Sequence, residues 1–130
     1  MAFDLAQYLK EKPVIALVGA TSNSQKYGNH ILKDLSVKGF QILPINNRAT
    51  EIEGKKAFPD LKTAILENPA IGLVVYVVPP KYTLEALKMA ASLNLKKAWI
   101  QPGAGDETVR DFLEANQFDF LMDACVMVMS

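Results

Sequence analysis

The sequence is poor in the features that define several classes of protein. Among its 130 residues there is one cysteine, Cys125, so no disulfide can form within the chain, and a reducing compartment is expected. The 14 basic and 14 acidic residues cancel, which argues against a general nucleic-acid or anionic-membrane binder. No apolar run approaches the roughly 20 residues of a membrane span, and charged residues interrupt the N-terminus before it reaches signal-peptide length. We therefore expect a soluble, cytoplasmic protein.

Metal ligands and catalytic pairs are equally scarce. His30 is the only histidine, and it stands next to the apolar Ile31. One histidine and one cysteine without clustered carboxylates do not make a metal site, so no metal is expected. A lone histidine in this setting is typical of a packed or half-exposed helix residue, and no nucleophile–base pair is evident.

What the sequence does contain is a regular alternation of apolar runs and amphipathic segments. Half of the residues are apolar and 22% are charged, and a chain of this length can bury roughly two thirds of its unfolded surface. We expect one domain over residues 1–130. The runs predict strands over 14–18, 40–45, 71–78, 95–101 and 118–122, and helices over 28–38, 60–66, 82–94 and 106–116. This order is typical of an α/β fold: a Rossmann-like, doubly wound, mostly parallel five-stranded sheet with helices on both faces.

Several local signals refine this prediction. Asp4, Asp60 and Asp106 each stand where a side chain can cap a helix N-terminus. Residues 51–58 predict a short hairpin that turns at Gly54, and the long apolar run over 71–78 predicts a central strand. Pro44 lacks an N–H group, so its strand is expected at an edge of the sheet or to end there.

The most informative segment is the first predicted strand-to-helix turn, residues 14–32. Its apolar run ends at Gly19 and passes through a polar loop containing Lys26 into a helix that starts near Gly28. Unpaired N–H groups at such a helix start attract phosphate. We favour a diphosphate site here over glycines that serve only tight packing.

The sequence disfavours NAD as the ligand. NAD-binding turns carry a tight G-x-G-x-x-G triplet and an acidic residue about 20 positions further on. Here the triplet is missing, and Arg48 stands 20 residues after Gly28. A cation at this place suits a phosphate on the ribose, either the 2′-phosphate of NADP or the 3′-phosphate of coenzyme A, although it could also be an ordinary surface arginine.

Five short motifs follow one another in an order that resembles a known family. They are Gly19-Ala-Thr-Ser-Asn-Ser-Gln-Lys-Tyr-Gly28, Pro44-Ile-Asn46, Val78-Pro-Pro80, Trp99-Ile-Gln-Pro-Gly103 and Asp123-Ala-Cys125. In this order they resemble the small bacterial CoA-binding proteins, and the N-terminal CoA-binding domain of the succinyl-CoA synthetase α subunit. The resemblance covers about residues 13–125, nearly the whole chain.

The resemblance implies a role for each motif. The first loop would hold the pyrophosphate of CoA, the second would lie by the ribose and its 3′-phosphate, the third would wall the adenine, and the fourth would line the path of the pantetheine arm. The residues concerned are Gly19, Ala20, Thr21, Asn23, Lys26 and Tyr27, then Asn46 and Arg48, then Val78 and Pro79, and finally Gln101 and Gly103.

The resemblance implies a stand-alone CoA- or acyl-CoA-binding protein, and the missing nucleophile–base pair favours a non-catalytic one. The alternatives are an NADP-dependent reductase and the CoA-binding part of a multi-subunit acyl-CoA ligase. Cys125 is a candidate redox residue, able to form a slow mixed disulfide with CoA under oxidising conditions, or else a small buried hydrophobe. The apolar tail over 126–129 predicts either core cover or a contact between copies in a homodimer.

Overall fold

The computed structural model describes residues 4–130 and contains the predicted parallel sheet. Its five strands lie in the order β2 (Ile42–Ile45), β1 (Val14–Val18), β5 (Ile71–Tyr76), β6 (Lys97–Ile100) and β7 (Asp119–Met122), and every neighbouring pair is parallel. The strands β1, β2, β5 and β6 are largely buried and apolar on both sides, as a sheet covered on both faces requires, whereas the edge strand β7 is partly exposed. The α/β, Rossmann-like fold class is confirmed.

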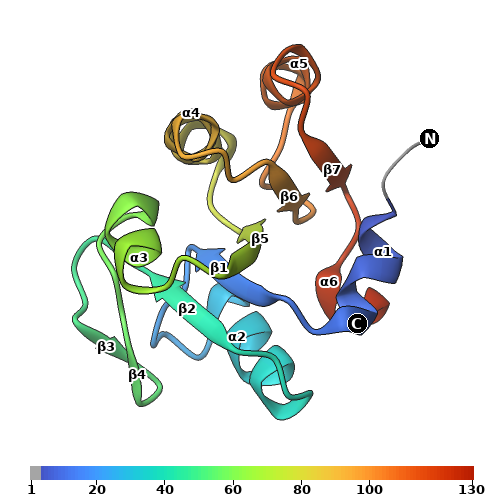
Figure 1. Cartoon of the computed structure of the whole chain (residues 1–130). Helices are drawn as coiled ribbons and strands as arrows, with labels where there is room; N and C mark the ends of the chain where they lie inside the picture. Colours follow the sequence, from blue (N-terminus) through green and yellow to red (C-terminus); the bar gives the residue numbers. More distant parts are fainter. Residues whose placement is uncertain (1–3) are drawn as a thin grey trace.

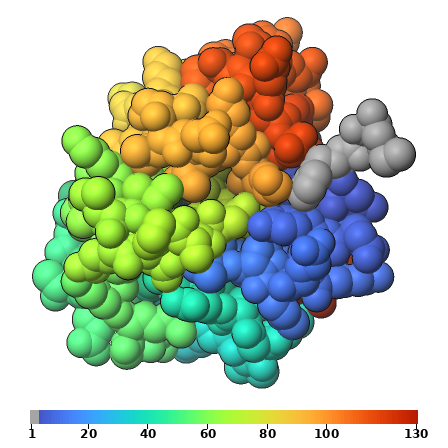
Figure 2. Space-filling view, viewed as in Figure 1, coloured from blue at the N-terminus to red at the C-terminus, as the bar shows by residue number. Residues whose placement is uncertain are grey.

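Helices cover both faces of the sheet (Figure 1). One face carries α3 (Leu61–Glu67), α4 (Pro80–Ser92) and α5 (Glu107–Ala115), and the other carries α1 (Leu5–Tyr8), α2 (Tyr27–Val37) and α6 (Val126–Met129). A 3₁₀ turn over Leu9–Glu11 extends α1. Figure 2, in the same orientation, shows α3 and α4 meeting at the surface, in agreement with their mutual contacts.

The core is divided by the sheet into two apolar layers. In β1, Ala16 and Val18 face the α3–α5 layer while Ile15 and Leu17 face the α1–α2–α6 layer. Trp99 of β6 is fully buried in the second layer, where its indole N–H donates to the Ala124 carbonyl at 2.7 Å. This bond and the burial of Val126 hold the C-terminal segment against the sheet.

The local signals in the sequence are confirmed at their positions. The carboxylates of Asp4, Asp60 and Asp106 accept from the third residue after each of them and cap α1, α3 and α5. The hairpin forms as β3 (Glu51–Ile52) and β4 (Lys55–Lys56), and β5 is the central strand. Pro44 lies in the edge strand β2, where a bridge between Ile45 and Phe58 covers the outer side.

Several predicted boundaries differ from the structure by one or two residues, and two of these differences lie at the carboxyl end of β5. The strand predicted over 71–78 ends at Tyr76, although the Val77 N–H still donates to the Val18 carbonyl at 3.0 Å. The helix predicted from residue 82 begins at Pro80, because proline is well suited to the first helical position, where no N–H is needed. Val77, Val78 and Pro79 therefore form a short connection at the carboxyl end of β5.

Candidate functional site

A cavity of about 760 Å³ opens at the carboxyl ends of β1, β2 and β5. In doubly wound sheets, ligands bind where the chain turns from one side of the first strand to the other. Here that place is the gap between β1 and β5, and the end of β1 and the connection after β5 line the cavity. The lining comes from residues 18–21, 26–28, 45–48, 59–61 and 77–79, and from Tyr82, Glu85, Ala86 and Met89 of α4.

Two glycines let the first loop and α2 come into close contact. Gly19 has a φ of +107°, and a Cβ at this position would press on the side chains of Val77 and Val78. A Cβ on Gly28 would overlap the carbonyl oxygen of Gly19. Both glycines are therefore required for packing, and both also line the cavity. A role of these glycines in tight packing is therefore compatible with a role in the predicted diphosphate site.

Three side chains tie back carbonyl groups of the loop between β1 and α2, residues 19–26, which we call the diphosphate loop. The Asn46 amide donates to the Ala20 carbonyl at 3.0 Å, and the Asn29 amide donates to the Thr21 carbonyl at 3.0 Å. A ring nitrogen of His30 lies 2.7 Å from the Ser24 carbonyl, which can only accept, so that nitrogen carries the proton.

Three of the eight N–H groups of the same loop are available, and the other five donate within the protein. Within residues 4–130, the N–H groups of Thr21, Ser22 and Ser24 have no protein acceptor. The first N–H groups of α2 are also unpaired by the geometry of a helix start. Occupied carbonyls and open N–H groups together give the loop the character of an anion site.

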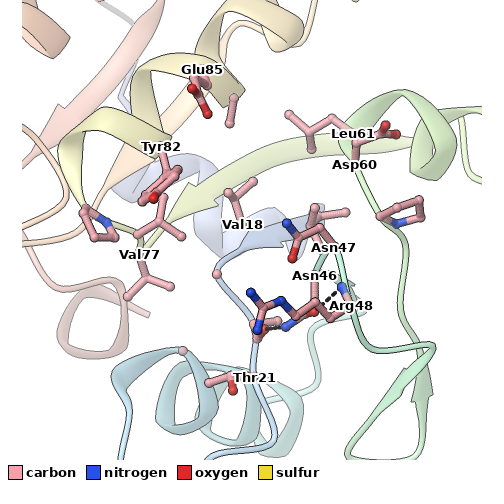
Figure 3. A pocket seen from close by; sticks show the side chains of 18 of the residues that line it. Val18, Thr21, Asn46, Asn47, Arg48, Asp60, Leu61, Val77, Tyr82 and Glu85 are labelled. Atoms are coloured by element: carbon pink, nitrogen blue, oxygen red, sulfur yellow. Dashed lines mark hydrogen bonds between the residues drawn. The ribbon is translucent and has the colours of Figure 1, made fainter.

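Two cations stand at this side of the cavity without acidic partners. Lys26 directly precedes α2, and Arg48 follows β2 in a turn fixed by Asn46, whose Oδ1 accepts from the Arg48 N–H at 2.8 Å. Neither side chain lies within 4.0 Å of a carboxylate in the described part of the chain. Figure 3 shows the Arg48 guanidinium turned toward the side of the cavity where Thr21 lies.

The side of the cavity opposite Lys26 and Arg48 is lined mainly by apolar side chains, together with two acidic residues. Leu61, Val77 and Val18 contribute apolar surface, and Glu85 of α4 lies at the same space (Figure 3). Asp60 also lines the cavity, but its carboxylate is turned toward the start of α3, which it caps. Hydrogen bonds from the Thr63 N–H and hydroxyl lower the pKa of Asp60. From the sequence, Asp60 was predicted only to cap a helix, and Glu85 was not predicted as a site residue. The one sequence feature that pointed to Glu85 was its position one helical turn after Tyr82, near the start of a helix that follows a strand end.

Most of the predicted site residues are brought together here. Gly19, Ala20, Thr21, Lys26, Tyr27, Asn46, Arg48, Val78 and Pro79 all line the cavity. Asn23 does not line it, because its carboxamide is used inside the loop, where it accepts from the Gln25 N–H at 3.0 Å.

The remaining predicted residues lie beyond the lining. Gln101 is fully buried, and its Oε1 accepts from the Val126 N–H at 2.8 Å, so it fastens the start of α6. Cys125 is half-buried with its Sγ 3.6 Å from Gln101 Nε2. Gly103 has a φ of +87° in the loop after β6. The pantetheine path along Gln101 and Gly103, and the mixed disulfide of Cys125, stay predictions.

Asn29 is a residue that sequence reasoning missed. It is 1% exposed in the first turn of α2 and holds the diphosphate loop from behind. A polar residue between Gly28 and an apolar helix face was a weak signal, since such residues are usually exposed.

Two further properties of the described residues bear on function. Within residues 4–130, no three histidine, cysteine or acidic side chains gather closely enough to hold a metal ion. Over the same residues, no helix has the length and apolar character needed to cross a membrane.

Comparison with known proteins gives a consistent result. A family described as CoA binding domain matches residues 13–130. A conserved hypothetical protein of known structure from Pyrococcus furiosus is 43% identical with a TM-score of 0.86, covering 91% of this chain and 99% of that one. A hypothetical protein from Pyrococcus horikoshii is 26% identical with a TM-score of 0.85, covering 97% and 87%.

A curated relative is a subunit of a larger enzyme. The ADP-forming acetate–CoA ligase II subunit alpha of Pyrococcus furiosus is 32% identical over 96 residues, which are 72% of this chain. Because the match covers 20% of that subunit, the chain spans about a fifth of the length of this relative.

Proposed function

Because the chain belongs to the family of CoA binding domains, we propose that it binds CoA or an acyl-CoA and performs no chemistry on it. One observation carries this proposal beyond the family match. The cavity at the end of β1 combines open N–H groups of the diphosphate loop with Lys26 and Arg48, two cations that have no acidic partner among residues 4–130. Such a set suits a ligand with phosphates at two places.

In the proposed complex, each side of the cavity takes one part of the ligand. The diphosphate lies on the loop and near Lys26, and the 3′-phosphate lies at Arg48. The adenine packs against the apolar connection formed by Val78 and Pro79. The cavity volume of about 760 Å³ is within the usual range for small-molecule sites.

The proposal of a non-catalytic role rests on the residues that face the cavity. The ring nitrogen of His30 is engaged with the Ser24 carbonyl, and Cys125 lies outside the cavity lining. No nucleophile with a base beside it is therefore found in the lining, which lies wholly within the described residues.

Calorimetric titration with CoA, dephospho-CoA, NADP and NAD tests the proposal. We expect CoA to bind tighter than dephospho-CoA by about tenfold, the value of one charge-assisted hydrogen bond. Arg48→Gln should remove most of that difference and leave the affinity for dephospho-CoA unchanged. Tighter binding of NADP would favour the reductase alternative, and tighter binding of NAD would contradict the proposal.

A second function, as the CoA-binding part of an acyl-CoA ligase, is favoured by the similarity to the acetate–CoA ligase subunit. The test is to incubate the protein with acetyl-CoA, ADP and phosphate and to measure ATP. The chain by itself is expected to make none under either function, because the match covers only 20% of the ligase subunit. ATP formed only when the chain is combined with the remaining parts of such a ligase would support this second function over a non-catalytic one.

A further inference from the structure

The hairpin between β2 and α3 has an unexpected residue at its tip. Ile52 pairs with Lys55, so the turn contains only Glu53 and Gly54, and both have positive φ angles of 50° and 77°. A two-residue turn of this kind is of type I′ and strongly prefers Asn-Gly. Glutamate is a poor residue for a positive φ, so its presence calls for a reason outside the turn.

The reason lies in the contacts of the Glu53 carboxylate. Its Oε2 accepts from Asn29 Nδ2 at 3.2 Å, and its Oε1 lies 3.8 Å from Lys33 Nζ. The same Asn29 amide nitrogen donates to the Thr21 carbonyl at 3.0 Å. A continuous chain of hydrogen bonds therefore runs from the hairpin tip through a buried amide to the diphosphate loop.

The Asn29 amide depends on these two acceptors for its orientation. On its other side, Oδ1 is buried and has no hydrogen-bond partner in the described part of the chain. No hydrogen bond to Oδ1 therefore opposes a half-turn rotation of the amide, which would place an oxygen against the Thr21 carbonyl. The Glu53 carboxylate opposes that rotation, since it can only accept.

From this arrangement we propose that Glu53 is a positioning residue for the CoA diphosphate. It acts through Asn29 and keeps the Thr21 carbonyl engaged, so that the loop N–H groups stay open to the ligand. Asn46 holds the neighbouring Ala20 carbonyl in the same way. The segment over 46–58 thus restrains the diphosphate loop directly through Asn46 and indirectly through Glu53 and Asn29. The same segment carries Arg48. This inference rests on the proposed function.

Two variants, Glu53→Asn and Glu53→Gly, separate an effect on the stability of the hairpin turn from an effect on CoA binding at the diphosphate loop. Both residues accept a positive φ better than glutamate does, so the melting temperature should stay the same or rise. Neither can reach Asn29 as glutamate does, so the Kd for CoA should rise by about 3- to 10-fold, as expected for one lost hydrogen bond. Glu53→Gln can accept or donate and so no longer selects one orientation of the Asn29 amide, and its Kd for CoA should lie between those of wild type and Glu53→Asn.

Two controls show where the effect acts. Glu51→Asn, on the same hairpin but with no contact to Asn29 among the described hydrogen bonds, should bind CoA like wild type. The ligand 3′-AMP has the 3′-phosphate but no diphosphate, so Glu53→Asn should leave its affinity unchanged.

The outcomes are distinct. If wild type does not bind CoA, the proposed function fails and this inference falls with it. If wild type binds CoA and both Glu53→Asn and Glu53→Gly bind it equally well, the inference alone is wrong. Equal losses for CoA and 3′-AMP would also overturn it, because they would indicate a general distortion and not a role at the diphosphate.

Discussion

At the scale of single residues, Lys26 is the cation placed closest in sequence to the start of α2. It lines the cavity, is exposed and has no acidic partner within 4.0 Å in the described chain. Lys26→Ala should weaken CoA binding by about 1.5–3 kcal/mol, because a charge-assisted bond to phosphate is lost. Its free energy of unfolding should stay within about 0.5 kcal/mol of wild type.

Calorimetry and urea denaturation measure both quantities for Lys26→Ala. Lys10→Ala, an exposed lysine outside the lining of the cavity, is the matched control and should change neither. An unchanged Kd for Lys26→Ala would show that this lysine is solvated and makes no contact with CoA.

Tyr76 presents the opposite situation, a polar group in the core. Its side chain is fully buried, and its hydroxyl has no hydrogen-bond partner in the described structure. An unsatisfied buried hydroxyl is destabilising, so Tyr76→Phe should raise the free energy of unfolding by about 1 kcal/mol at pH 7. Lower stability of the variant would show that the hydroxyl has a partner, such as a buried water.

The same residue predicts a dependence on alkaline pH. Burial raises the pKa of Tyr76 above its ordinary value. Above about pH 10 the unfolded chain loses this proton while the folded chain keeps it, so stability falls as the pH rises. Urea denaturation between pH 8 and 11 should show a larger gain for Tyr76→Phe at the higher pH, whereas the exposed Tyr82→Phe should show none.

At the scale of elements, α3 depends on the charge of its cap. The pKa of Asp60 is lowered mainly by the Thr63 N–H and also by the Thr63 hydroxyl. The cap's contribution is therefore complete above about pH 4, the ordinary value of an aspartate, and is lost as the pH falls through the lower folded pKa. Asp60→Asn keeps an acceptor oxygen but does not titrate.

Chemical denaturation between pH 2 and 6 measures the free energy of unfolding of wild type and of Asp60→Asn. The stability of wild type should fall relative to Asp60→Asn as the pH decreases. Asp111→Asn, at an exposed position of α5, should run parallel to wild type. A constant difference between wild type and Asp60→Asn would mean that the carboxylate charge does not support α3.

At the scale of the whole molecule, ligand binding should be visible as stability. The cavity joins residues from β1, β2, α2, α3, α4 and the connection after β5, so its ligand binds the folded chain only. At 100 times its Kd, CoA should add about 2.7 kcal/mol, which for a domain of this size is roughly 10 °C in melting temperature. Thermal denaturation with CoA measures this shift, and NAD at the same concentration should give a smaller one. No shift with CoA would contradict specific binding.

The sequence by itself determined the elements and the class of sheet that they form. Uncharged apolar runs such as 71–76 cannot lie at the surface, and the helices capped by Asp60 and Asp106 alternate with such runs along the chain. A parallel sheet covered on both faces follows from that alternation. The diphosphate loop was equally accessible to sequence reasoning, because its glycines, Lys26 and the helix start are contiguous in the chain.

Only the tertiary structure decided which loops share the cavity. All five strand ends were equivalent candidates in the sequence, but the order β2-β1-β5-β6-β7 sets the ends of β6 and β7 progressively farther from β1. Neighbouring strands lie about 4.8 Å apart, so Gln101 and Cys125 fall outside the lining while Asp60 and Glu85 enter it. The link from Glu53 through Asn29 to Thr21 joins residues up to 32 positions apart. No local pattern encodes it, because a buried hydrogen bond depends on how the hairpin packs against α2.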